Sequence, residues 1–163
     1  MSTGDIMPYS NTGASKIDGA LKYFVASGTT ASIKAGEPVT KVAGAATVLT
    51  MATNGPTTTA RIVGVASSVS NETASAAGTV DIIPANAGQI WLIAPNVAAT
   101  WNTQAKYNAL CGARVLVDKT GSVYTILAAD GASNGCIVEW LDVARYPGQV
   151  AFSWSPLCDY RNV

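Results

Sequence analysis

The apolar residues of this chain fall in short runs, and nearly every run is closed by a turn that contains glycine or proline. Such turn signals occupy residues 35–38 (Ala-Gly-Glu-Pro) and 54–56 (Asn-Gly-Pro). Other prolines stand at the ends of the runs, where a missing amide donor does least harm to a strand. Regularly spaced short strands with such turns are typical of an all-β barrel or sandwich. The predicted strands are 21–25, 30–34, 39–42, 46–52, 61–66, 79–83, 89–94, 113–117, 122–127, 136–143 and 149–153.

Residues 100–112 form the one segment that favours a helix. Asn102 or Thr103 can cap its start, and Gly112 suits the left-handed residue just past its end. A helix of about two turns is unstable on its own, so we expect it to close one end of the sheet or barrel. The residues expected on its buried face are Ala105, Ala109 and Leu110.

A β-hairpin is predicted directly after this segment. Residues 113–117 and 122–127 flank the sequence Asp-Lys-Thr-Gly at 118–121, where glycine supplies the positive φ that tight hairpin turns require. Residues 136–143 then alternate in character, which predicts a strand with Cys136, Val138 and Trp140 on one face.

The chain divides into three parts. Residues 1–20 are rich in glycine and small polar residues and show no hydrophobic period, so we interpret them as an N-terminal arm. Residues 21–154 hold the predicted strands and form one β-barrel domain, and residues 155–163 form a C-terminal tail. No internal period is visible that would indicate a repeat-built protein.

The chain contains no histidine, and only 12% of its residues are charged. Histidine is the commonest general base, so an enzyme without it needs clustered carboxylates, a reactive cysteine or lysine, or a cofactor loop. The glycines form no nucleotide-binding motif, and no acidic pair is suggested by its spacing. We therefore expect no catalytic, cofactor-binding or metal site. A carboxylate pair assembled in space is the enzyme alternative.

Three cysteines, Cys111, Cys136 and Cys158, form an odd set without the spacing of a zinc site or a redox pair. Two interpretations stay open. The cysteines are reduced thiols that serve as small apolar residues, or one of them forms a disulfide with a partner after the protein leaves the cell.

Ten Lys and Arg residues balance ten Asp and Glu residues, so the formal net charge is zero. A neutral surface gives no electrostatic reason to bind nucleic acid or an anionic membrane, and weak net repulsion favours association. Residues 1–15 lack the basic start and apolar core of a signal peptide, and no apolar run approaches the length of a transmembrane helix. We expect synthesis in the cytoplasm, followed by self-assembly or docking onto a larger body.

Three stretches carry a resemblance to a known family. They are residues 35–39 (Ala-Gly-Glu-Pro-Val), 62–66 (Ile-Val-Gly-Val-Ala) and 77–83 (Ala-Gly-Thr-Val-Asp-Ile-Ile). In this order they are similar to the capsid decoration (cement) proteins of tailed bacteriophages. The resemblance implies a small β-barrel protein of the virion that binds the outer surface of an icosahedral head. It further implies that the protein stabilises contacts between major capsid proteins and associates with itself, commonly as a trimer.

The resemblance also implies that the N-terminal arm contacts the capsid. Aromatic residues near the C-terminus are further candidates for partner contact, because aromatics are enriched in the buried centres of interfaces. Core packing is the alternative interpretation of these aromatics. The candidate partner-binding residues are Ile6, Met7, Pro8, Tyr9, Tyr146, Phe152, Trp154 and Tyr160.

A tail or fibre component, or a carbohydrate-binding module of a virion, is the alternative function. Its platform would consist of exposed aromatic side chains that stack on sugar rings. The tryptophans that would supply it are Trp91, Trp101, Trp140 and Trp154.

Overall fold

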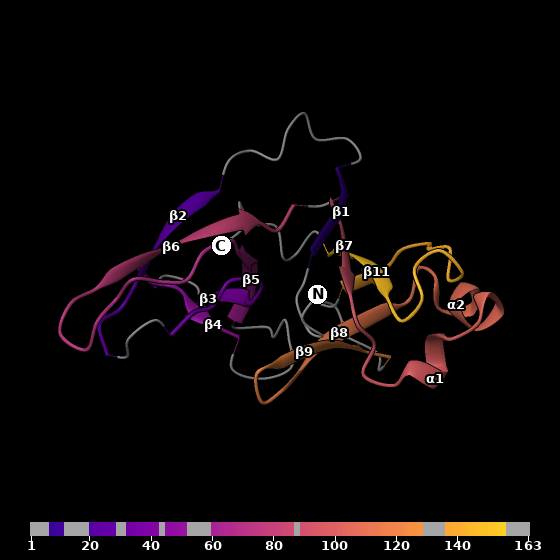
Figure 1. Cartoon of the computed structure of the whole chain (residues 1–163). Coiled ribbons are helices and arrows are strands. Elements are labelled where there is room, and N and C mark those ends of the chain that lie inside the picture. The colour runs from indigo at the N-terminus through magenta and orange to yellow at the C-terminus, as the bar shows by residue number, and fades with distance from the viewer. Residues whose placement is uncertain are drawn as a thin grey trace.

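Two lobes of antiparallel strands lie side by side in this protein (Figure 1). The structure is a computed structural model, and it describes residues 7–11, 20–28, 32–42, 45–51, 60–86, 89–128 and 136–155, with residues 7–11 and 60 described by backbone only. The described residues form strands and two short helices, which confirms the predicted all-β class.

The first lobe is a five-stranded sheet in the order β2-β6-β5-β3-β4. It curls until its first strand meets its last, where Val25 and Val48 form a parallel bridge and the Val48 amide donates to the Phe24 carbonyl at 2.9 Å. A small apolar interior is enclosed in this way. The strands are β2 (Leu21–Val25), β3 (Pro38–Val42), β4 (Leu49–Thr50), β5 (Ala60–Ala66) and β6 (Gly78–Pro84).

The second lobe is a six-stranded sheet in the order β1-β7-β11-β10-β8-β9. It also curls and closes, because Pro95 and Ile126 form a parallel bridge and the Ile126 amide donates to the Ala94 carbonyl at 2.9 Å. β1 therefore lies outside the closed part, on the edge of β7. The strands are β1 (Met7–Asn11), β7 (Gln89–Ile93), β8 (Arg114–Thr120), β9 (Val123–Leu127), β10 (Cys136–Val138) and β11 (Val150–Trp154).

The structure has two short helices where one was predicted over residues 100–112: α1 (Ala98–Trp101), which begins before that segment, and α2 (Gln104–Leu110), which lies within it. The predicted cap is confirmed, since the Thr103 side chain accepts a hydrogen bond from the Lys106 amide. The predicted buried face is wrong for Ala105 and Ala109, which are exposed, and Leu110 is half-buried. Tyr107 is instead the side chain of α2 that is buried in the core.

Some predicted strands are shorter or missing. Residues 32–34 form no strand, because the Ser32 amide bonds the Glu72 carboxylate and the Ile33 amide bonds the Ser70 hydroxyl instead of a neighbouring strand. Strand β10 ends at Val138, after which the predicted alternation breaks and Trp140 is 64% exposed. The hairpin of β8 and β9 is confirmed, with Gly121 at φ +64° in its turn.

The larger apolar core extends across both lobes. Side chains of the first lobe such as Met51, Ile62 and Val65 belong to the same cluster as the aromatic residues of the second. A polar contact reinforces the junction, since the Thr50 and Tyr124 hydroxyls lie 3.0 Å apart. The ends of the predicted barrel domain, residues 21 and 154, coincide with the start of β2 and the end of β11.

Candidate functional site

Part of the predicted N-terminal arm pairs with its own chain. Met7, Pro8 and Tyr9 belong to β1, in which Met7 is opposite Leu92 and Pro8 is opposite Trp91. These candidates therefore lie on an outer strand of the second lobe. Two further candidates, Ile6 and Tyr160, lie outside the described residues.

The aromatic candidates of β11 are core residues. Phe152 is fully buried and Trp154 is 1% exposed, because β11 is flanked by β7 and β10. The Trp154 ring meets Phe152 edge-on, with ring centroids 4.9 Å apart. The core interpretation of these two residues is therefore the right one, and partner contact is the wrong one. Tyr146 is half-buried against the larger core, with the Arg145 guanidinium 5.5 Å from its ring centroid.

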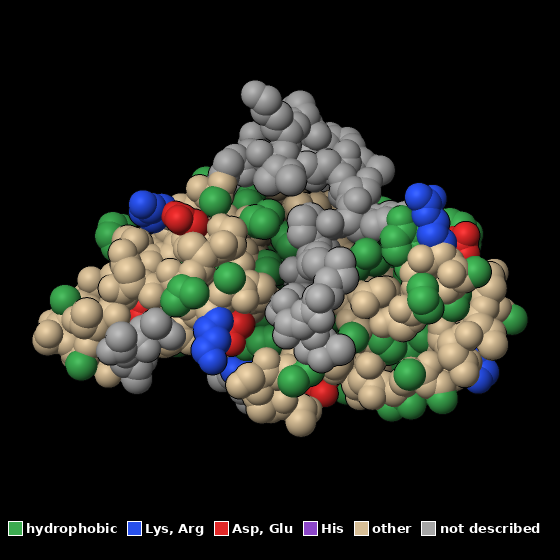
Figure 2. All heavy atoms as spheres, viewed as in Figure 1, with side chains coloured by type: hydrophobic (Ala, Val, Ile, Leu, Met, Phe, Trp, Pro, Cys, Tyr) green, Lys and Arg blue, Asp and Glu red, His purple; other side chains and the backbone are tan. Residues whose placement is uncertain are grey.

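The exposed large apolar side chains are spread over both lobes, and Figure 2 shows them interspersed with few and scattered charged side chains on one face. Two of them lie on the strands that the bridge closing the first lobe joins. Phe24 on β2 is 65% exposed and Leu49 on β4 is 55% exposed, and the Val25–Val48 bridge joins these strand ends. The other exposed apolar residues are Val42, Val69, Val97, Val123 and Trp140.

A buried carboxylate ties two loops of the first lobe together. Glu72 is 1% exposed, and its Oε1 accepts hydrogen bonds from the Ser32 amide, at 2.5 Å, and from the Ser32 hydroxyl. Burial acts to raise the pKa of Glu72, but hydrogen bonds from Ser32 and Ser70 outweigh it and lower the pKa to about 2. A carboxylate that stays ionised in this way holds a loop and does not exchange protons near neutral pH.

The titratable cluster beside α2 also has a structural role. The Tyr107 hydroxyl accepts from the Ala151 amide at 2.8 Å and donates to the Glu139 carbonyl at 3.0 Å. Burial raises the pKa of Tyr107, and burial together with the Glu139 charge raises the pKa of Cys111. A thiol held in its protonated form is a poor nucleophile. Neither Cys111 nor Cys136 forms a disulfide, and Cys158 lies outside the described residues.

A shallow groove lies at the start of α2, between Thr103 and the loop before β11. Its polar groups bind its own loops: the Gln104 amide donates to the Leu141 carbonyl and accepts from the Val143 amide, and Asp142 accepts from the Ala144 amide. No group of potential metal ligands occurs among the residues that the structure describes. The groove therefore offers little unused polar chemistry to a ligand.

Comparison of the chain with protein-family models, with curated proteins and with solved structures gives no match in any of the three. Within the described part of the chain, no helix has the length and apolar character needed to cross a membrane. The function is therefore inferred from the residues and their geometry.

Proposed function

We propose that this chain is a structural virion protein. It binds the outer surface of an icosahedral phage head and stabilises contacts between major capsid proteins. The observation that carries the proposal is the position in the fold of the three stretches that resemble decoration proteins, residues 35–39, 62–66 and 77–83. They lie on β3, β5 and β6, which are neighbours in one curled sheet, with Pro38 opposite Val65 and Val65 opposite Ile83. A shared unit of structure is what a family resemblance of this kind requires.

The use of polar groups also supports a role based on surfaces. Five acidic side chains of the described residues accept hydrogen bonds from their own chain, and these bonds shape loops and turns or join strands. The five are Glu37, Glu72, Asp118, Glu139 and Asp142. Groups engaged in this way are poorly placed to act on a substrate.

The mechanism would be mass action. A protein that binds the assembled shell but not its separate subunits stabilises the shell, by about 2.7 kcal/mol for each site when the free protein is at 100 times its Kd. A molecule that touches several subunits gains further from high effective concentration. No chemical step is needed for this function.

The carbohydrate-binding alternative is less well supported. It needs exposed tryptophans, but Trp91, Trp101 and Trp154 are all buried. Trp140 is exposed, and a single ring is a small platform for a sugar chain.

The experiment is a binding assay with heads of the phage that encodes this chain, prepared without it. Purified chain is added to expanded heads and to unexpanded procapsids, which serve as the control. We expect saturable binding to expanded heads, a copy number that matches a symmetry position of the shell, and a raised melting temperature of the heads. Failure to bind expanded heads would exclude the proposal, and binding to a glycan array instead would support the alternative.

A further inference from the structure

The two lobes share one topology. If the strands of each lobe are numbered one to five along the chain, those of the first lobe (β2-β6-β5-β3-β4) lie in the order 1-5-4-2-3 across the sheet. The strands of the second lobe (β7-β11-β10-β8-β9) lie in the same order. In both lobes the parallel bridge that closes the sheet joins the first strand to the third. β1 is the only strand of the described residues that falls outside this scheme.

The register of the strands is the same as well. Every pair of neighbouring strands in one lobe has a counterpart in the other with the residues matched one for one. The matched pairs are Lys22–Asp81 with Leu92–Ala151, Ala66–Ile82 with Val138–Phe152, Val39–Gly64 with Val115–Cys136, and Thr40–Leu49 with Leu116–Leu127.

The turn that leads into the second strand is duplicated in detail. Gly36 and Gly112 have φ values of +85° and +79°. Each donates its amide, at 2.8 Å, to the carbonyl of the last residue of the fourth strand, which is Ala66 in the first lobe and Val138 in the second. A second hydrogen bond also corresponds. The Ala66 amide donates to the Glu37 carbonyl at 2.9 Å, and the Val138 amide donates to the Ala113 carbonyl at 3.0 Å. The lobes are therefore two copies of one five-stranded unit.

One strand edge differs between the copies. In the second lobe β1 covers the outer edge of the first strand, with Met7 opposite Leu92 and Ser10 opposite Ile90. The matched register makes Lys22 the counterpart of Leu92 and Ala20 the counterpart of Ile90. In the part of the chain that the structure describes, no strand pairs with β2 on this side before the Val25–Val48 bridge. We call the main-chain groups of Ala20 and Lys22, with the Phe24 side chain, the β2 edge.

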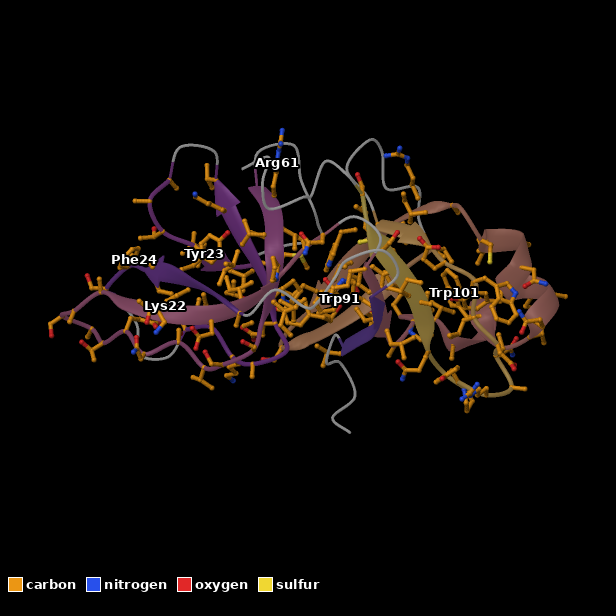
Figure 3. All side chains as sticks on the ribbon, turned by 90° about the horizontal axis from the view of Figure 1, so that it is seen from above. Lys22, Tyr23, Phe24, Arg61, Trp91 and Trp101 are labelled. Carbon is orange, nitrogen blue, oxygen red and sulfur yellow. The ribbon has the colours of Figure 1, made fainter. Side chains whose placement is uncertain are left out.

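The main-chain groups of the β2 edge point away from β6. The Phe24 carbonyl accepts from the Val48 amide, so it faces the side opposite β6. Because the amide and carbonyl of alternate residues point to the same side of an antiparallel strand, those of Lys22 face that side also. The Lys22 and Phe24 side chains are both exposed. Figure 3 shows them on β2 in the first lobe, on the opposite side of the molecule from Trp101 in the second.

We propose that the β2 edge binds an extended segment of the major capsid protein, which adds an antiparallel strand to the first lobe as β1 does to the second. This rests on the proposed function. The described residues contain two equivalent edges but one covering strand, β1, which pairs with β7. On the proposed function, the strand that covers the β2 edge is supplied by the capsid. Main-chain hydrogen bonds give such strand addition its affinity, while Lys22 favours an acidic residue opposite it and Phe24 favours an apolar one.

The test uses a synthetic peptide that copies residues 6–12 of this chain as the probe, because β1 already fits the equivalent edge. Lys22→Pro removes the outward amide of the β2 edge and leaves the bonds to β6 intact, whereas Lys22→Ala keeps that amide and serves as the matched control. Peptide binding is measured by fluorescence anisotropy, and folding by thermal melting. We expect wild type and Lys22→Ala to bind alike and Lys22→Pro to bind at least about tenfold more weakly.

Hydrogen exchange at the Lys22 amide in the wild-type chain provides a measurement that needs no variant. Saturating peptide should slow this exchange, and unchanged exchange overturns the proposal even if Lys22→Pro fails to fold. Equal peptide binding by folded Lys22→Pro overturns it too. A dimer of the chain that Lys22→Pro abolishes would mean that a second copy, not a capsid protein, occupies the edge.

Binding of the same variants to expanded heads separates the two proposals. Loss of head binding by Lys22→Pro but not by Lys22→Ala supports the β2 edge as the capsid contact. If heads bind Lys22→Pro as well as wild type, the proposed function stands and the β2 edge proposal is wrong. If heads bind neither, the proposed function itself fails.

Discussion

Neutralising the buried carboxylate of Glu72 should make the protein less stable at neutral pH, and this cost should disappear in acid. Glu72→Gln keeps a carbonyl oxygen for Ser32 but removes the charge that strengthens both hydrogen bonds. A pKa lowered from 4.5 to about 2 in the folded chain corresponds to about 3 kcal/mol of stability at pH 7. Hydrogen bonds to a charged group contribute about 1.5–3 kcal/mol, so the two approaches agree.

The sign of the pH dependence follows from the direction of the shift. A lowered pKa in the folded state contributes stability that is complete above the unfolded value and is lost as the pH falls through the folded value. The difference in unfolding free energy between wild type and Glu72→Gln should therefore be largest above pH 5 and fade toward pH 2. Urea denaturation at a series of pH values measures it, and the other carboxylates cancel because both proteins carry them.

Asp118→Asn is the matched control. Asp118 accepts one side-chain hydrogen bond, from the Thr120 hydroxyl at 3.1 Å, on the rim of the hairpin. Its replacement should change stability by no more than about 0.5 kcal/mol. A gap between wild type and Glu72→Gln that stays constant from pH 7 to pH 2, or one as small as that of the control, would refute the role given to Glu72.

Other substitutions test the packing of the two lobes. A Cβ at Gly64 would lie 2.1 Å from the Ile83 carbonyl oxygen, so Gly64→Ala should lower the free energy of unfolding by at least about 2 kcal/mol; calorimetry that finds no loss would contradict the close approach of β5 and β6. Tyr107→Phe leaves the buried Ala151 amide without its hydroxyl partner and should cost about 1–3 kcal/mol in chemical denaturation. Because burial raises the pKa of Tyr107 in the folded state, wild type should lose more stability than Tyr107→Phe above about pH 10, where this hydroxyl ionises in the unfolded chain but stays protonated in the folded one. Because the pKa of Cys111 is raised, iodoacetamide should label it more slowly than a free cysteine at pH 7.5, and equal labelling rates in mass spectrometry would argue against its burial.

Local chemistry in the sequence determined the elements that depend on neighbouring residues. Gly121 and Gly112 adopt the left-handed backbone that their turns demand, and Thr103 caps α2, because glycine conformation and capping act within a few residues. The short strands were predictable for the same reason. Residues 32–34 were not, since the amides of Ser32 and Ile33 bind the side chains of Glu72 and Ser70, far along the chain.

Burial was decided by the tertiary structure. Phe152, Trp154 and Tyr107 are all aromatic residues that the sequence leaves equally suited to a core or to an interface. Their depth follows from the position of β11 in the middle of its sheet and from the packing of α2 over it.

The duplication of the five-stranded unit is the clearest case of what only the tertiary structure reveals. Few matched positions carry the same residue, and the predicted absence of a period follows from that. An interior strand position needs an apolar side chain and a turn needs glycine, but neither needs one particular sequence. The sequence alone therefore determined short strands and turns, while hydrogen-bond register between distant segments decided that they form one unit twice, with β1 on one copy only. The identical matches include Gly36 with Gly112, Val39 with Val115, Leu49 with Leu127, and Val80 with Val150.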